Sequence, residues 1–128
     1  MGRNMFGPGR GDWDLAWDGW WGQDPPHHAP VFVLTHHQRA PLVMKGGTTF
    51  HFVTEGLVRR APAAREAAGE RAVAIAGGAS PVNQALAAGA VDELWLHIAP
   101  ITLGAGNGSS TGSATSPWSR WRPATRTW

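Results

Sequence analysis

Residues 71–106 read RAVAIAGGASPVNQALAAGAVDELWLHIAPITLGAG, and the rest of the fold can be built outward from them. The stretch begins with Ala72–Ala76, a short apolar run that a glycine pair closes, and such a run is typical of a strand buried on both faces. Ser80 suits the N-cap of a following helix, Pro81 suits its first position and Gly89 suits its end. The stretch therefore predicts a strand, a glycine turn and a helix in succession.

The glycine turn predicts an anion site. The helix is expected over Asn83–Ala88, which is rich in alanine and leucine, and a second strand over Leu94–Ile101, where Pro100 marks the end of central pairing. A strand, a glycine pair and a helix start bring backbone N–H groups together, and a helix N-terminus carries about half a positive charge. This arrangement fits a phosphate or a pyrophosphate. The alternative is a tight turn in which the glycines only let the chain bend.

The composition limits the classes of protein that remain. A chain of 128 residues is expected to form one domain. It has no cysteine, which excludes disulfides, thiolate metal sites and a cysteine nucleophile. No apolar run is long enough to span a membrane, and the first ten residues lack an apolar signal region. We therefore expect a cytoplasmic protein with no membrane partner.

Charge and histidine spacing argue against nucleic acids and metals. The net charge is +2, and the cations are scattered, with Arg59 and Arg60 as the one adjacent pair. A nucleic-acid surface needs a concentrated basic stripe, so no nucleic-acid partner is expected. The six histidines include the adjacent pairs His27–His28 and His36–His37, but none has the i, i+4 spacing that puts two ligands on one helix face. We therefore expect no metal site.

The middle of the chain predicts two more strands. Val31–Leu34 is a continuous apolar run, and Thr49–Val53 is β-branched and aromatic. Gln38–Gly47 between them reads as a loop, and the alanine-rich Pro62–Ala68 reads as a short helix that Gly69 ends. The order of strand, loop, strand, helix, strand, turn, helix and strand indicates an α/β sheet with helices packed against it.

The first thirty residues read as a long loop. Glycine and proline recur in them, and four tryptophans lie among four aspartates. Such tryptophans either pack a loop onto the body of the protein, which is the favoured reading, or stack on an aromatic ligand. Trp20 and Trp21 are the candidates for stacking on a substrate.

With these elements placed, the chain resembles the dihydrofolate reductase-like family, which includes the reductase domain of riboflavin biosynthesis. The resemblance covers residues 1–106 in order. The residues that carry it are Met1-Gly2-Arg3, Pro30–Thr35, Gly47–Val53, Ala76–Ser80 with Gln84, Ala88–Leu94, Leu96-His97, Pro100 and Leu103–Gly106.

The resemblance implies a three-layer sheet flanked by helices that binds NADPH and reduces a small heterocycle, of pteridine or pyrimidine type, by hydride transfer. It places Gly2 and Arg3 on the phosphate side of the cofactor, and Thr35 and His36 beside the adenosine phosphate. Arg3 favours the phosphorylated dinucleotide, because a guanidinium makes charge-assisted contacts to phosphate. The residues implied to cradle the pyrophosphate are Gly77, Gly78, Ala79 and Ser80, with Gln84 nearby on the following helix. No residue is assigned as a catalytic acid.

The chain departs from the family pattern at both ends. Family members carry a first strand, a substrate loop and a helix before the glycine-arginine pair, whereas here Met1 lies directly on it. After Gly106 the sequence loses the family pattern, and a shift of reading frame there would restore it. We therefore expect a partial domain over residues 1–106 that lacks its first and last strands, followed by a disordered tail over residues 107–128.

These departures leave the activity of the chain open to three readings. The first is an NADPH-dependent reductase whose substrate side is mostly lost. The second is a non-catalytic nucleotide-binding or self-associating module, because unpaired strand edges invite pairing with a second copy as a homodimer. The third is an inactive fragment.

Overall fold

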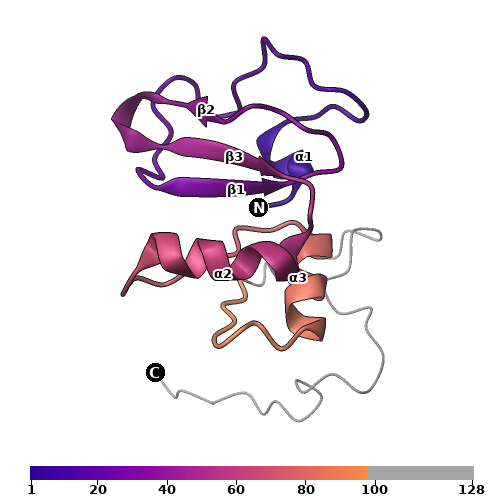
Figure 1. The fold of residues 1–128 in the computed structure, drawn as a ribbon, viewed down its shortest axis with the longest axis vertical. Coiled ribbons are helices and arrows are strands. Elements are labelled where there is room, and N and C mark those ends of the chain that lie inside the picture. The colour runs from indigo at the N-terminus through magenta and orange to yellow at the C-terminus, as the bar shows by residue number, and fades with distance from the viewer. Residues whose placement is uncertain (98–128) are drawn as a thin grey trace.

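A computed structural model of the protein describes residues 1–97. The elements in chain order are α1 (Arg3–Phe6), β1 (Pro30–Leu34), β2 (Leu42–Val43), the single 3₁₀ turn η1 (Lys45–Gly47), β3 (Thr49–Val53), α2 (Leu57–Ala68) and α3 (Ala79–Ala87). Figure 1 shows the strands together, with α2 and α3 beneath them. The α/β class expected from the sequence is confirmed for these residues.

The sheet has the strand order β1-β3-β2. β1 and β3 run parallel, with Val31 opposite Phe50 and Val33 opposite Phe52, and β2 pairs antiparallel with β3. Both predicted middle strands are confirmed, because β-branched and aromatic residues suit a half-buried pleated surface. The short strand β2 (Leu42–Val43) lies inside the predicted loop and was not expected.

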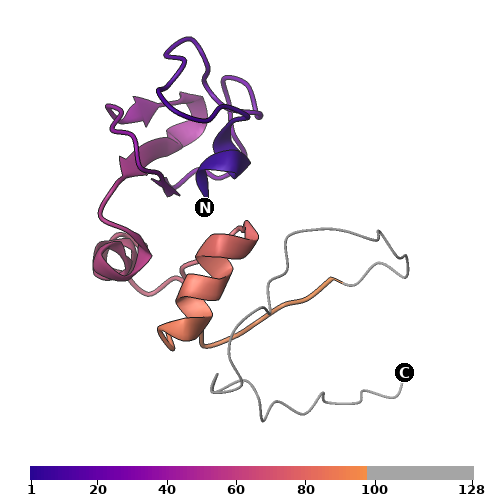
Figure 2. The same ribbon diagram turned by 90° about the vertical axis from the view of Figure 1, so that its right-hand side faces the viewer.

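The two faces of the sheet are covered differently. On one face Phe6 of α1 meets Val33 and Phe50, and all three side chains are fully buried. On the other face α2 packs against β1, with the Arg60 guanidinium 5.5 Å from the centre of the Phe32 ring. Neighbouring residues of a strand point to opposite faces, so Val33 packs on the side of α1 and Phe32 on the side of α2. Figure 2 shows α1 beside the sheet and the two longer helices below it.

The predicted strand Ala72–Ala76 does not form, and most of the segment is exposed. The reason lies at the outer edge of β1. Among residues 1–97, only Met1 and Gly2 lie along that edge: the N–H of Leu34 donates to the Met1 carbonyl (2.9 Å), and the N–H of Gly2 donates to the Gly77 carbonyl (2.9 Å). Two residues offer too few ladder bonds to align a third strand beyond them.

The predicted strand Leu94–Ile101 is also not seen in its described part. Residues 94–97 have no regular structure, and Trp95 is 75% exposed. Residues 98–101 lie outside the described residues, as do the expected tail over 107–128 and the frame boundary at Gly106.

The helices begin earlier than predicted. α2 starts at Leu57 and carries Pro62 within it, and α3 starts at Ala79 with Gly78 as its N-cap, so Ser80 lies in the first turn and is not the cap. The predicted ends hold: Gly69 (φ +60°) and Gly89 (φ +62°) both have the left-handed backbone that favours glycine. None of the helices within residues 1–97 has the length and apolar character that a transmembrane span requires.

Candidate functional site

The N-terminus of α3 lies against the first residues of the chain. Besides the Gly2–Gly77 hydrogen bond, the backbone of Gly2 approaches α3 closely: a Cβ added at Gly2 would lie 3.2 Å from Cγ of Pro81 and 3.6 Å from the backbone nitrogen of Gly78. A side chain at position 2 would therefore crowd the turn. The structure brings together the two predicted glycine motifs, which are 75 residues apart in sequence.

The turn before α3 has the features of an anion site. Gly77 has φ +115°, and the Gly77–Gly78 peptide bond is cis. Within residues 1–97 the backbone N–H groups of Gly78, Ala79 and Ser80 have no hydrogen-bond acceptor, and Gly78 and Ser80 are exposed. Three free donors at the positive end of a nine-residue helix can bind a phosphate group.

The predicted pair on α3 is in contact. The Gln84 amide nitrogen donates to the Ser80 hydroxyl oxygen at 3.1 Å, and both side chains are exposed. Because the amide holds this oxygen as an acceptor, the Ser80 hydroxyl proton stays available for an oxygen of a bound anion.

Arg3 contacts the loop that follows α1. Its guanidinium lies 4.0 Å from the centre of the Trp13 ring, and it donates to the backbone carbonyls of Gly11 and Asp12. Its Nε is buried and has no partner within the described residues. The predicted contact from Arg3 to a cofactor phosphate is therefore not prepared in this conformation.

Thr35 and His36, the two residues predicted to lie beside the adenosine phosphate, follow the end of β1. The N–H of Thr35 donates to the Val53 carbonyl at 3.0 Å, and its hydroxyl oxygen accepts from the N–H of His37 at 3.1 Å. Thr35 is 8% exposed, so it shapes the strand end, whereas His36 is exposed. His37 also pairs through Nδ1 with the Asp12 carboxylate at 3.3 Å.

Three segments thus lie side by side at the carboxyl end of β1. Residues 77–80 adjoin Gly2 through the Gly2–Gly77 hydrogen bond, and Gly2 pairs with Leu34, which leads into Thr35 and His36. Two strand spacings amount to about 10 Å. Carboxyl ends of parallel strands are where open α/β sheets bind ligands.

Trp20 and Trp21 lie elsewhere, within the aromatic cluster on the covered face of the sheet. The Trp21 ring stacks on Phe50 at 5.8 Å, and Trp20, which is 55% exposed, meets the edge of Trp17 at 4.7 Å. The favoured reading of the tryptophans as loop-packing residues fits this placement. Their role toward a substrate stays a prediction.

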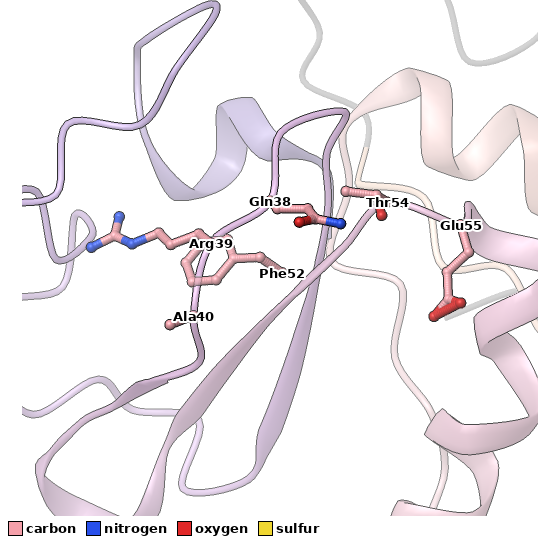
Figure 3. Close-up of a pocket in the computed structure, with 6 residues that line it drawn as sticks. All are labelled: Gln38, Arg39, Ala40, Phe52, Thr54 and Glu55. Carbon is pink, nitrogen blue, oxygen red and sulfur yellow. The ribbon is translucent and has the colours of Figure 1, made fainter.

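A shallow cavity of about 430 Å³ lies next to the ends of β1 and β3. The sequence did not predict this cavity, because no pattern in residues 38–47 indicated that β2 would form and pair with β3. Figure 3 shows Gln38 and Thr54 facing each other across it, while the Arg39 guanidinium points the other way. The lining residues are Gln38, Arg39, Ala40, Phe52, Thr54 and Glu55.

Arg39 fastens the tryptophan loop to the sheet. One of its terminal nitrogens donates to the carbonyls of Trp17 (2.8 Å) and Leu15 (3.3 Å). Burial lowers the pKa of the guanidinium from its ordinary value, and Asp14 and Asp18 act in the opposite direction. The guanidinium is therefore a structural cation between the loop and the aromatic cluster.

His27 is the other perturbed side chain. Its Nε2 is buried without a partner in residues 1–97, and its ring meets the edge of Trp21 at 4.9 Å. Burial lowers the pKa of His27, and the positive charges of the Met1 ammonium and His28 lower it further. Within the described residues no cluster of three histidine, aspartate or glutamate side chains could hold a metal ion.

The fold and the turn together define a small α/β protein in which, among residues 1–97, the N–H groups of Gly78, Ala79 and Ser80 are free near the carboxyl end of β1. The family model of the RibD C-terminal domain matches residues 1–124, and the chain belongs to that family. The resemblance to the riboflavin-biosynthesis reductase domain and its dihydrofolate reductase-like relatives is thereby confirmed. No curated protein matches the chain. The division of the chain at Gly106 stays a prediction.

Proposed function

We propose that the chain binds NADPH and belongs to a reductase that transfers hydride to a small heterocyclic substrate of pteridine or pyrimidine type. The observation that carries this proposal is the set of free N–H groups at Gly78, Ala79 and Ser80. A dinucleotide has a pyrophosphate bridge, which suits donors at a helix N-terminus. Membership of the RibD C-terminal domain family supports a reductase of this kind.

The residues at the turn fit the pyrophosphate. A Cβ added at Gly78 would meet no atom within 4 Å, so there is open space beside Gly78, while Gly2 lets the neighbouring backbone come close. Gly77–Ser80 would hold the bridge, Gln84 would keep the Ser80 hydroxyl in position, and Thr35 and His36 would lie toward the adenosine. The bound cofactor would supply the hydride.

A second candidate function is a non-catalytic dinucleotide-binding module that associates with itself. The observation in its favour is the outer edge of β1, where Met1 and Gly2 alone pair within the described part of the chain. Apolar side chains are also exposed on segments outside the helices and strands: Val73, Leu94, Trp95 and Leu96. Exposed apolar groups and unpaired edges favour a homodimer.

The cytoplasmic location expected from the sequence stays a prediction.

Titration with NADPH tests the shared part of both candidates. The Trp13 ring lies against Arg3, next to Gly2, so bound cofactor should quench tryptophan emission in a saturable way. Absence of saturation up to millimolar NADPH would contradict any cofactor role. Oxidation of NADPH with a pteridine or pyrimidine substrate would separate the reductase from the binding module.

A further inference from the structure

The loop over residues 11–13 is fastened to the carboxyl end of β1 and to Arg3. The indole N–H of Trp13 donates to the His37 carbonyl at 2.8 Å, and the Asp12 carboxylate lies 3.3 Å from Nδ1 of His37. Arg3 stacks over Trp13 and donates to the carbonyls of Gly11 and Asp12. The loop thus brings one carboxylate and one guanidinium to the place where β1 ends.

This place lies on the path of the adenosine half of a dinucleotide, an inference that rests on the proposed function. A pyrophosphate at residues 77–80 has Gly2 and Arg3 as its next neighbours and the end of β1 after them, over about 10 Å. On the opposite side of residues 77–80, the described part of the chain has no paired strand. The adenosine ribose of a bound dinucleotide would therefore lie toward Arg3, His36 and Asp12.

Arg3 and Asp12 bring opposite unit charges to this place. Arg3 carries one positive charge, but part of its donor capacity is used by the two loop carbonyls. Asp12 carries one negative charge, and its side chain is fully exposed. A ribose 2′-hydroxyl can donate to a carboxylate, whereas a 2′-phosphate carries nearly two negative charges that a carboxylate repels. Arg3 alone would favour NADPH, and Asp12 opposes that preference.

We propose that Asp12 sets the choice of dinucleotide, so that the chain binds NADH about as tightly as NADPH. The loop that presents Asp12 lies outside the motifs that carry the family resemblance. Arg3 alone would favour the phosphorylated cofactor, and Asp12 removes that preference.

The test compares dissociation constants for NADPH and NADH, measured by quenching of tryptophan emission in the whole chain. In the unchanged protein the two constants should agree within about threefold. In Asp12→Asn the preference for NADPH should rise about five- to tenfold, as expected for removing one charge several ångströms from a phosphate dianion in water. Glu66→Gln is the matched control, because it removes the same charge from the exposed face of α2 and should leave the ratio unchanged.

The outcomes are distinct. A strong preference for NADPH in the unchanged protein that Asp12→Asn does not alter overturns the role of Asp12 while leaving the proposed function intact. An equal rise in Asp12→Asn and Glu66→Gln shows a general charge effect and also overturns it. Failure of both dinucleotides to bind removes the proposed function, and this inference with it.

Discussion

Replacing Ser80 by aspartate should weaken cofactor binding without harming the fold. Ser80 lies in the first turn of α3, and its side chain is exposed. An aspartate there would place a carboxylate roughly one helical turn, about 6 Å, from a bound pyrophosphate that carries two negative charges. Coulomb repulsion at an effective dielectric constant between about 80 and 40 then amounts to about 1.4 to 2.8 kcal/mol. The expected loss of NADPH affinity is about 10- to 100-fold.

The same change should leave the helix at least as stable. A carboxylate in the first turn interacts favourably with the helix dipole, by about 0.3–1 kcal/mol. It also keeps an acceptor for the Gln84 amide, which bonds to Ser80 at 3.1 Å. Loss of binding together with an unchanged or raised melting temperature would therefore report on the anion site itself.

The assay is an NADPH titration of the unchanged chain, Ser80→Asp and Ser80→Asn, with melting temperatures measured in parallel. The asparagine variant has nearly the shape of aspartate but no charge, so it should bind NADPH within a few-fold of the unchanged chain. Equal affinity of the aspartate and asparagine variants would refute the reasoning, because the phosphates would then lie elsewhere.

Three further outcomes follow from the core, the half-buried His27 and the exposed Trp95. Phe6→Ala should destabilise the fold by about 3–5 kcal/mol in urea unfolding, because the Phe6 side chain is fully buried at the centre of the cluster, whereas Leu15→Ala, at an exposed site, should change it little. Burial lowers the pKa of His27 below 6.5, so as the pH falls the unfolded chain takes up a proton before the folded chain does. The free energy of unfolding should therefore stay constant above pH 6.5 and decrease below it. His27→Gln should flatten this pH dependence, which is measured as the urea midpoint at each pH. Trp95→Ser should shift sedimentation toward monomer if the exposed apolar segments join two copies, and an unchanged distribution would argue against that interface.

The strands with strong local signals could be predicted from sequence alone. β1 and β3 follow from continuous apolar and β-branched runs, and Gly69 and Gly89 mark the helix ends because their backbone is left-handed. The strand predicted over Ala72–Ala76 has an equally apolar sequence but does not form. Pairing depends on what lies beside a segment, and a single hydrogen bond from Gly2 does not replace a neighbouring strand.

The candidate site was predictable only where adjacent residues determine the local structure. Local chemistry identified the glycine turn at Gly77–Ser80, because cap and dipole arguments need only adjacent residues. The direction of the Arg3 side chain was not predictable, since it depends on Trp13 and on loop carbonyls that aperiodic sequence does not position. The Asp12–His37 pair joins residues 25 positions apart and was missed for that reason.

Arg39 has a consequence for how ligands reach the protein. Its guanidinium lies 5.1 Å from the centre of the Phe52 ring and 5.6 Å from that of Phe6, while it holds the Trp17 carbonyl. Lifting the tryptophan loop would break these contacts together and expose a fully buried phenylalanine to water. The tryptophan loop consequently keeps small molecules away from Phe6, whereas the shallow cavity beside Arg39 and Phe52 stays accessible to them.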